Sequence, residues 1–259
     1  DPDFADVPLK GLLSKEYAGE VARSLDAGRP VVENLSDDPP WNYFETRGIH
    51  DPWLFEGRPR PAGQPGPSVE TTADCTTHLG AADKDGNLVS CTQTAVSTFG
   101  SKVVTKGLGF VWNNGMVWFN AQPGAVNSIA AWKRPLVNMA PLLVTRGGKP
   151  HLSVGSPGGR QVINANINVI LNVLEFGMGP QQAITAPRPD AAGPKNLVDS
   201  RLDTRVVDAL RQMGHRIEVV SDVEAWYRFA RPSTILVDQD AGLLRAGTHT
   251  LQTAESVGY

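Results

Sequence analysis

The chain has 259 residues, of which 41% are hydrophobic and 20% charged, and its formal net charge at pH 7 is −3. This is the composition of an ordinary globular protein, and the small negative charge favours neither a nucleic acid nor an anionic membrane as partner. No apolar run reaches the roughly 18 residues of a membrane helix, and Cys75 and Cys91 are too few for a disulfide framework.

An amphipathic helix is predicted over residues 14–27. Its apolar side chains recur every four residues, at Leu13, Tyr17, Val21 and Leu25. Ser14 can cap its start, and Gly28 can end it. Ten of the 20 prolines lie in residues 1–75, so the stretch from Arg29 to Cys75 is predicted to be extended, and residues 57–75 to be mobile.

Residues 76–96 are predicted to form a β-hairpin. Lys84-Asp85 suits a type I turn, and Gly86 suits the left-handed position of a three-residue loop. If Asp83 pairs with Asn87, Thr76 faces Thr94 with both side chains on one side of the ladder. A two-residue loop would instead pair Thr76 with Ala95.

The rest of the chain predicts alternating strands and helices. The expected elements are a strand at 152–154, a largely buried helix at 161–176, a helix ended by Gly214, and strands near 216–220, 233–238 and 243–247. The segment from Gly155 to Gly159 is predicted to be a tight loop before a helix. The fold class is therefore expected to be α/β.

Gly158 and Gly159 are candidates for an oxyanion hole. Two glycines let backbone N–H groups approach a reacting oxygen, and a helix N-terminus favours developing negative charge. A structural turn is the plain alternative. A phosphate loop is a further alternative, but the segment lacks the spacing of the P-loop and of the dinucleotide-binding glycines.

Thr76 can act as a nucleophile if the Cys75–Thr76 bond is cut. A threonine hydroxyl is weak alone, and the freed α-amino group, with a pKa of about 7.7–8.0, would then serve as its general base. By itself, Thr-Thr-His also fits an ordinary strand start. The histidines at 78, 151 and 249 show no metal-ligand spacing, and neither a metal nor a cofactor is expected.

Several motifs occur together in a characteristic order. They are Thr76-Thr77-His78, Phe99-Gly100, Asn113-Asn114, Lys133-Arg134-Pro135-Leu136 and Gly155-Ser156-Pro157-Gly158-Gly159. From about residue 76 to Tyr259 the chain resembles the γ-glutamyltransferase family of N-terminal-nucleophile hydrolases. The resemblance implies a four-layer αββα sandwich, self-cleavage between Cys75 and Thr76, and catalytic roles for Thr76, Thr94, Gly158 and Gly159.

The resemblance also implies a division of the chain. Residues 1–75 would be the C-terminal part of a large-subunit segment, and residues 76–259 the small, catalytic subunit. An upstream segment would complete the sandwich, and a higher oligomer is a further expectation. Neither nucleic acid nor membrane is expected as a partner. The location in the cell stays open, with the cytoplasm slightly favoured over the periplasm or secretion.

The chain departs from the family where γ-glutamyl donors are held. The family's donor-binding asparagine is replaced by Val96 in this chain. Its Gln-x-x-Asp motif is replaced at both ends, by Gly115 and Trp118, and its Ser-Ser pair by Val137-Asn138. Each lost hydrogen bond to a charged group is worth roughly 1.5–3 kcal/mol. The resemblance therefore implies an amidohydrolase or acylase acting on a small amide or peptide. A γ-glutamyl transferase and an inactive scaffold are the alternatives.

The acyl pocket is expected to include the residues at these changed positions. The candidates for substrate binding are Val96, Asn114, Gly115, Trp118, Val137 and Asn138, with Trp112 and Phe119 beside them.

Overall fold

The computed structural model describes residues 1–24, 52–59, 75–193, 195–221, 223–224, 228–251 and 253–258. Most of the predicted proline-rich tract lies outside these ranges. The chain divides into two units, which are described one at a time. Unit 1 comprises 1–71, 115–137 and 209–216, and unit 2 comprises 72–114, 138–208 and 217–259.

Unit 1 contains short helices held by side chains that cap backbone groups. Its elements include α1 (Leu9–Leu12), α2 (Lys15–Ser24) and the 3₁₀ helices η1 (Pro52–Phe55) and η2 (Gly115–Trp118). Ser14 Oγ accepts the N–H of Tyr17 at 3.1 Å, so the predicted cap of α2 is confirmed. The predicted residues 25–27 of this helix lie outside the described part.

Unit 2 is built on the predicted hairpin and a larger sheet. Strands β1 (Thr76–Ala82) and β2 (Leu88–Thr94) form the hairpin, and β3 (Leu142–Arg146), β4 (Lys149–Gly155), β8 (Ser233–Asp238) and β9 (Leu243–Thr248) form the sheet, in the order β3-β4-β8-β9. The hairpin lies against β4 and β8. Ser153 Oγ donates to the Val89 carbonyl at 3.1 Å, and Ser90 Oγ to the Val154 carbonyl at 3.1 Å.

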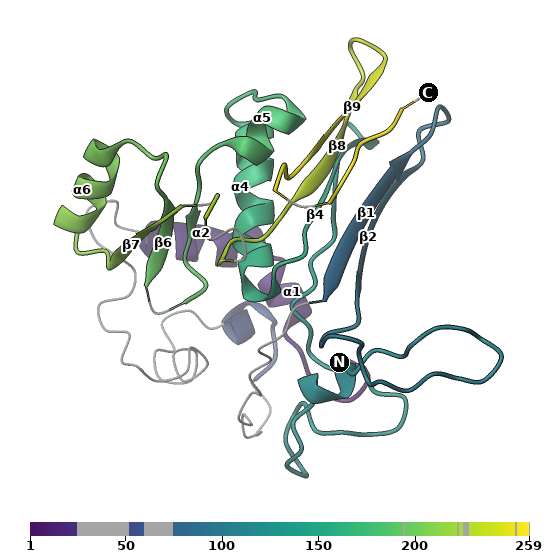
Figure 1. Cartoon of the computed structure of the whole chain (residues 1–259). Helices are drawn as coiled ribbons and strands as arrows, with labels where there is room; N and C mark the ends of the chain where they lie inside the picture. Colours follow the sequence, from purple (N-terminus) through teal and green to yellow (C-terminus); the bar gives the residue numbers. More distant parts are fainter. Residues whose placement is uncertain are drawn as a thin grey trace. The chain divides into compact units, whose positions relative to one another are not determined.

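Helices cover the other face of the larger sheet. Helix α4 (Val162–Leu174) contacts β4, and α5 (Pro180–Thr185) contacts β8 and β9 (Figure 1). Because side chains alternate along a strand, Leu152 and Val154 enter the core with Val169 of α4, while Ser153 points to the hairpin. The unit therefore has two facing sheets and one helical layer.

A third sheet follows α5. It consists of β5 (Pro189–Asp190), β6 (Asn196–Asp199) and β7 (Ile217–Val220), with β6 and β7 parallel. Helix α6 (Thr204–Gln212) lies between β6 and β7 in the chain. Leu197, Val220 and Phe229 form a small buried cluster beside this sheet.

The predicted strands at 152–154, 216–220, 233–238 and 243–247 and the helix before Gly214 are confirmed, with small shifts of their ends. The prediction that the helix at 161–176 is largely buried was wrong. Its residues Val162, Ala165 and Val169 are buried, whereas Ile163, Ile167 and Leu171 are about half exposed. Only one side of α4 packs on the sheet and α5, so its apolar character overstated its burial. In the described residues, no helix is both long and apolar enough to cross a membrane.

Candidate active site

The hairpin has the register that a three-residue loop predicts. Thr76 pairs with Thr94, and the Asp83 N–H donates to the Asn87 carbonyl at 3.1 Å. Gly86 has a φ of +86°, which is the left-handed conformation expected at that position. The hydroxyl oxygens of Thr76 and Thr94 are 3.0 Å apart. The two threonines are therefore neighbours on the face that meets β4 and β8.

Thr94 also contacts the peptide bond that precedes Thr76. Its hydroxyl donates to the Cys75 carbonyl at 3.4 Å, and its oxygen accepts the N–H of Val96 at 2.8 Å. One side chain thus touches both the candidate nucleophile and the candidate cleavage site. The roles of Thr76 as nucleophile and of Thr94 as its partner stay predictions, and the two hydroxyls lie within hydrogen-bond distance.

Val96 occupies an unusual backbone conformation. Its φ is +72°, and its side chain is 3% exposed. β-Branched residues rarely adopt the left-handed region, where asparagine and glycine are far better tolerated. The structure therefore holds an apolar, strained residue two positions after Thr94.

Asn114 braces the turn around Val96. Its side-chain amide donates to Ser97 Oγ at 2.8 Å, its side-chain carbonyl accepts the Ser97 N–H at 2.9 Å, and its backbone N–H donates to the Ala95 carbonyl at 3.2 Å. The side-chain carbonyl and the side-chain NH₂ group of Asn114 are therefore both engaged in hydrogen bonds. Asn114 is therefore suited to fixing the turn, and its contact with substrate stays a prediction.

The glycine loop lies between β4 and α4, as the sequence predicts. Gly158 has a φ of +142° and Gly159 a φ of +57°, and Gly159 opens the 3₁₀ turn η3 (Gly159–Gln161) that leads into α4. A Cβ on Gly158 would lie 2.5 Å from Cα of Ala230, so a side chain there would collide with backbone. Glycine is required at 158 for both reasons.

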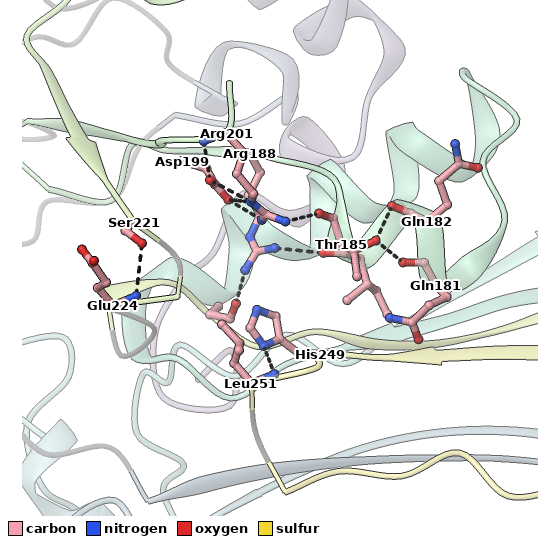
Figure 2. Close-up of polar contacts among 12 residues, drawn as sticks. Gln181, Gln182, Thr185, Arg188, Asp199, Arg201, Ser221, Glu224, His249 and Leu251 are labelled. Carbon is pink, nitrogen blue, oxygen red and sulfur yellow. Dashed lines mark hydrogen bonds and ion pairs between the residues drawn. The ribbon is translucent and has the colours of Figure 1, made fainter. Parts of the chain in front are cut away.

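The segment that packs on Gly158 is held by a buried arginine. Arg188 is 4% exposed and donates to the Ala230 carbonyl at 2.7 Å and to the Ile184 carbonyl at 3.1 Å (Figure 2). The next residue, Arg231, donates its backbone N–H to the Pro157 carbonyl at 3.0 Å. Arg188 therefore supports the loop through residues 230 and 231.

A second arginine, Arg201, lies in the same cluster and binds Asp199 and α5. Arg201 forms an ion pair with the buried Asp199 and donates to the Thr185 carbonyl at 2.9 Å (Figure 2). The Asp199 N–H donates to the Arg188 carbonyl at 3.2 Å. This part of the network joins α5 to β6.

The first residue of the loop has its own buried support. Ser156 Oγ donates to the side-chain carbonyl of Asn166 at 2.8 Å, and the Asn166 amide donates to the Ala140 carbonyl at 2.7 Å. Ser156 and Asn166 are fully buried. A satisfied polar pair in such a site specifies one arrangement of the groups around it.

His78 links β1 to the same loop. Its ring packs against Gly155, where a Cβ would come within 2.1 Å of the imidazole, and its Nδ1 lies 2.9 Å from Thr92 Oγ1. Burial lowers the pKa of His78 from 6.5 to about 4. The imidazole is therefore neutral at physiological pH.

A cavity of about 300 Å³ opens beside Thr76. Its walls are residues 76–80 of β1, Ser153 of β4, Pro157, residues 233–235 of β8, residues 246–248 of β9 and residues 253–257. The last segment includes an acidic residue, Glu255. The position of residues 253–257 beside Thr76 could not be predicted from the sequence, because these residues form no regular element.

The remaining predicted pocket residues are divided between the units. Asn138, half-buried, belongs to unit 2, while Gly115, Trp118, Phe119 and Val137 belong to unit 1. Their part in the acyl pocket stays a prediction. Trp112 belongs to unit 2 and is 47% exposed, with its ring edge-on to Phe110. Among the described residues, no group of three or more His, Cys, Asp and Glu side chains is arranged to hold a metal ion.

Comparison with known proteins connects these features to one family. The family model for gamma-glutamyltranspeptidase matches residues 1–257. The chain is 30% identical over its full length to the glutathione hydrolase proenzyme of Bacillus subtilis and covers 41% of it. It is 32% identical over 217 residues to the acylase ACY 1 proenzyme of a Pseudomonas species, covering 84% of this chain and 33% of that protein.

A solved structure supports the same relationship. The crystal structure of cephalosporin acylase from Bacillus halodurans is 26% identical and matches all of this chain and 41% of its own, with a TM-score of 0.72. The expected α/β fold of the N-terminal-nucleophile hydrolase type is thereby confirmed. The chain spans a third to two fifths of the length of these relatives. With its ordered motifs, threonine pair and glycine loop, the chain belongs to the gamma-glutamyltranspeptidase family.

Proposed function

We propose that the protein is a self-processing amidohydrolase or acylase that cleaves an amide through an acyl-enzyme on Thr76. The observation that carries this proposal is the 3.0 Å contact between the Thr76 and Thr94 hydroxyls, beside both the cavity and the Cys75 carbonyl. Relatives named as hydrolase and acylase proenzymes support it. The chain would be divided at Cys75–Thr76 into a large-subunit part and a small catalytic part.

The first reaction would be self-cleavage. The Thr76 hydroxyl attacks the Cys75 carbonyl carbon, the C–N bond breaks, and an ester joins the two parts. Water then hydrolyses the ester. The products are a carboxylate on Cys75 and a free α-amino group on Thr76, which is the general base that the nucleophile needs.

Turnover would repeat this chemistry on an external amide. The Thr76 amine takes the proton of its own hydroxyl as the oxygen attacks the amide carbonyl. The N–H groups of Gly158 and Gly159 would stabilise the tetrahedral oxyanion, as the positive-φ backbone and the following helix favour. The leaving amine takes the proton, and water releases the acyl group.

The preferred acyl donor would lack a free α-amino group. Val96 is apolar and buried at the position where γ-glutamyl users of the family carry an amide, and an ammonium facing it would lose water without gaining a partner. Trp118, at the position of the family's carboxylate, offers at most a cation–π contact of roughly 0.5–2 kcal/mol.

A γ-glutamyl transferase is the second candidate, and Glu255 favours it. Glu255 is one of the residues that line the cavity beside Thr76, and a glutamate carboxylate can pair with a donor's ammonium. The relatives named glutathione hydrolase are consistent with this alternative.

A panel of chromogenic anilides tests the proposal. The full-length protein is expected to hydrolyse an anilide of an uncharged or simple dicarboxylic acyl group, to act poorly on γ-glutamyl-p-nitroanilide, and to lose both activities in Thr76→Ala. Val96→Asn combined with Trp118→Asp should narrow the difference between the donors. Efficient γ-glutamyl turnover that disappears in Glu255→Gln would establish the second candidate instead.

A further inference from the structure

A buried asparagine lies among apolar side chains on one side of α4. Asn166 is fully buried, and Val162, Val169 and Val173, which share its side of the helix, are buried too. An amide in such surroundings has lost its water, so both of its ends need hydrogen-bond partners inside the protein. The bonds of Asn166 therefore favour one arrangement of the segments that supply its partners.

The orientation of the Asn166 amide follows from its partners. The Ala140 carbonyl can only accept, so the side-chain NH₂ group of Asn166 faces it, at 2.7 Å. The side-chain carbonyl then faces Ser156, whose hydroxyl donates to it at 2.8 Å. Ser156 is fully buried as well. Each end of the amide thus binds a different segment of the chain.

The two segments lie just beyond the end of a strand ladder. Strands β3 and β4 pair as far as Leu142 and Val154. Two residues further on in the same register, Ala140 would lie opposite Ser156. The ladder ends before that point, where the residue preceding Leu142 is a proline, which has no N–H to donate. The Asn166 side chain bonds to both Ala140 and Ser156 and so joins the segments beyond the ladder.

Ser156 lies at the start of the loop that carries Gly158 and Gly159. Glycines have no side chains to hold their backbone, so the positions of their N–H groups depend on the residues around them. Gly155, the residue before Ser156, packs against the His78 imidazole of β1. The start of the loop is thus in contact with both β1 and α4.

We infer that Asn166 is a positioning residue, which ties the start of the glycine loop to the end of the β3–β4 ladder and so sets where the Gly158 and Gly159 N–H groups lie relative to Thr76. The inference rests on the proposed function, in which these N–H groups would stabilise the oxyanion. Asn166 acts through Ser156 rather than on the substrate. A displacement of about 1 Å in an active site can cost about 10²-fold in rate, so an untied loop should lower turnover.

Asn166→Leu and Ser156→Ala, each made in the full-length protein, test this role. Both should lower kcat on an accepted anilide by about tenfold or more, counted per free Thr76 terminus, with KM within about twofold of the unsubstituted value. Asn172→Leu is the matched control. Asn172 lies in the same helix, and its side-chain amide donates to the Ala183 carbonyl at 3.1 Å. This control should lower the melting temperature while kcat stays unchanged.

The double variant Ser156→Ala with Asn166→Leu separates positioning from stability. Asn166→Leu alone leaves the buried Ser156 hydroxyl without its acceptor, and the second change removes that hydroxyl. The double variant should therefore melt above Asn166→Leu. Its kcat should stay as low as in Asn166→Leu, because the loop is still untied.

Recovery of kcat together with the melting temperature in the double variant would overturn the inference, as would an equal fall of kcat in Asn172→Leu or an unchanged kcat in folded Asn166→Leu. Ser156→Ala keeps the bond to Ala140 and is the milder change, so its kcat decides the matter alone if Asn166→Leu does not fold. These results leave the proposed function intact. An unsubstituted full-length protein that neither cleaves itself nor hydrolyses an amide would instead remove that function.

Discussion

Gly158 lies directly against Ala230, so a side-chain carbon on Gly158 would stand 2.5 Å from both Cα and Cβ of Ala230. Gly159, the next residue, has open space around its Cα apart from the Gln161 side chain at 3.7 Å. The two glycines of the loop are therefore under different constraints, although both have positive φ.

Gly158→Ala is expected to displace the loop, because backbone at Ala230 cannot yield as a flexible side chain can. We expect kcat on an accepted anilide to fall by about 10²-fold or more, as for loss of an oxyanion donor. Gly159→Ala should cost about 1 kcal/mol of stability and less than tenfold in kcat. Steady-state kinetics with a thermal melt of each protein checks this, and equal losses of kcat in both variants would contradict it.

Arg188 and Arg201 form a matched pair for testing support of the loop. Arg188→Met leaves the Ala230 and Ile184 carbonyls without their donor, and Arg201→Met leaves the buried Asp199 carboxylate without its ion-pair partner. Each should lower the free energy of unfolding by about 2–4 kcal/mol. Of the two, Arg188→Met should also lower kcat at unchanged KM, since Arg188 donates directly to the Ala230 carbonyl in the segment against Gly158. A fall in kcat of the same size in Arg201→Met would reduce Arg188 to a purely structural role.

Val96→Asn tests the strain beside Thr94. Burying an amide in place of an apolar side chain costs roughly 1–3 kcal/mol, but asparagine recovers about 1–2 kcal/mol by accepting a left-handed backbone. The net loss measured by urea unfolding should be about 1 kcal/mol or less. Val154→Asn, at a fully buried strand position, has no such compensation and should lose about 3 kcal/mol or more. Similar losses at the two positions would show that Val96 is unstrained.

Some of these features could be predicted from the sequence and others could not. The pairing of Thr76 with Thr94 follows from Asp83, Gly86 and Asn87, because a hairpin's register is set by residues within its own turn. The loop before α4 follows likewise from consecutive glycines. Local chemistry determines both.

The supports of the site depend on contacts between distant residues. Arg188 meets Ala230 across 42 residues, and Asn166 meets Ala140 across 26. Neither an arginine after a proline nor an asparagine within an apolar helix identifies its partner in the sequence. The position of residues 253–257 at the cavity also depends on contacts with distant residues, and no local sequence pattern indicates it.

His78 predicts how stability changes with pH. Its folded pKa of about 4 lies below the ordinary value of 6.5, so the unfolded chain binds more protons between these values. The contribution of the neutral His78 to the free energy of unfolding is therefore fully present above pH 6.5 and is lost as the pH falls toward 4. The melting temperature should drop across this window, and His78→Gln, which keeps a hydrogen-bonding side chain without titrating, should flatten the drop. An unchanged slope in His78→Gln would place the pH dependence elsewhere.

The central claim, that Thr76 becomes a free N-terminal nucleophile, is tested most directly by intact-mass analysis of the full-length protein after purification. The account predicts two chains, the smaller beginning at Thr76, and a single uncleaved chain for Thr76→Ala. A single chain from the unsubstituted protein, or two chains from Thr76→Ala without added protease, would contradict it.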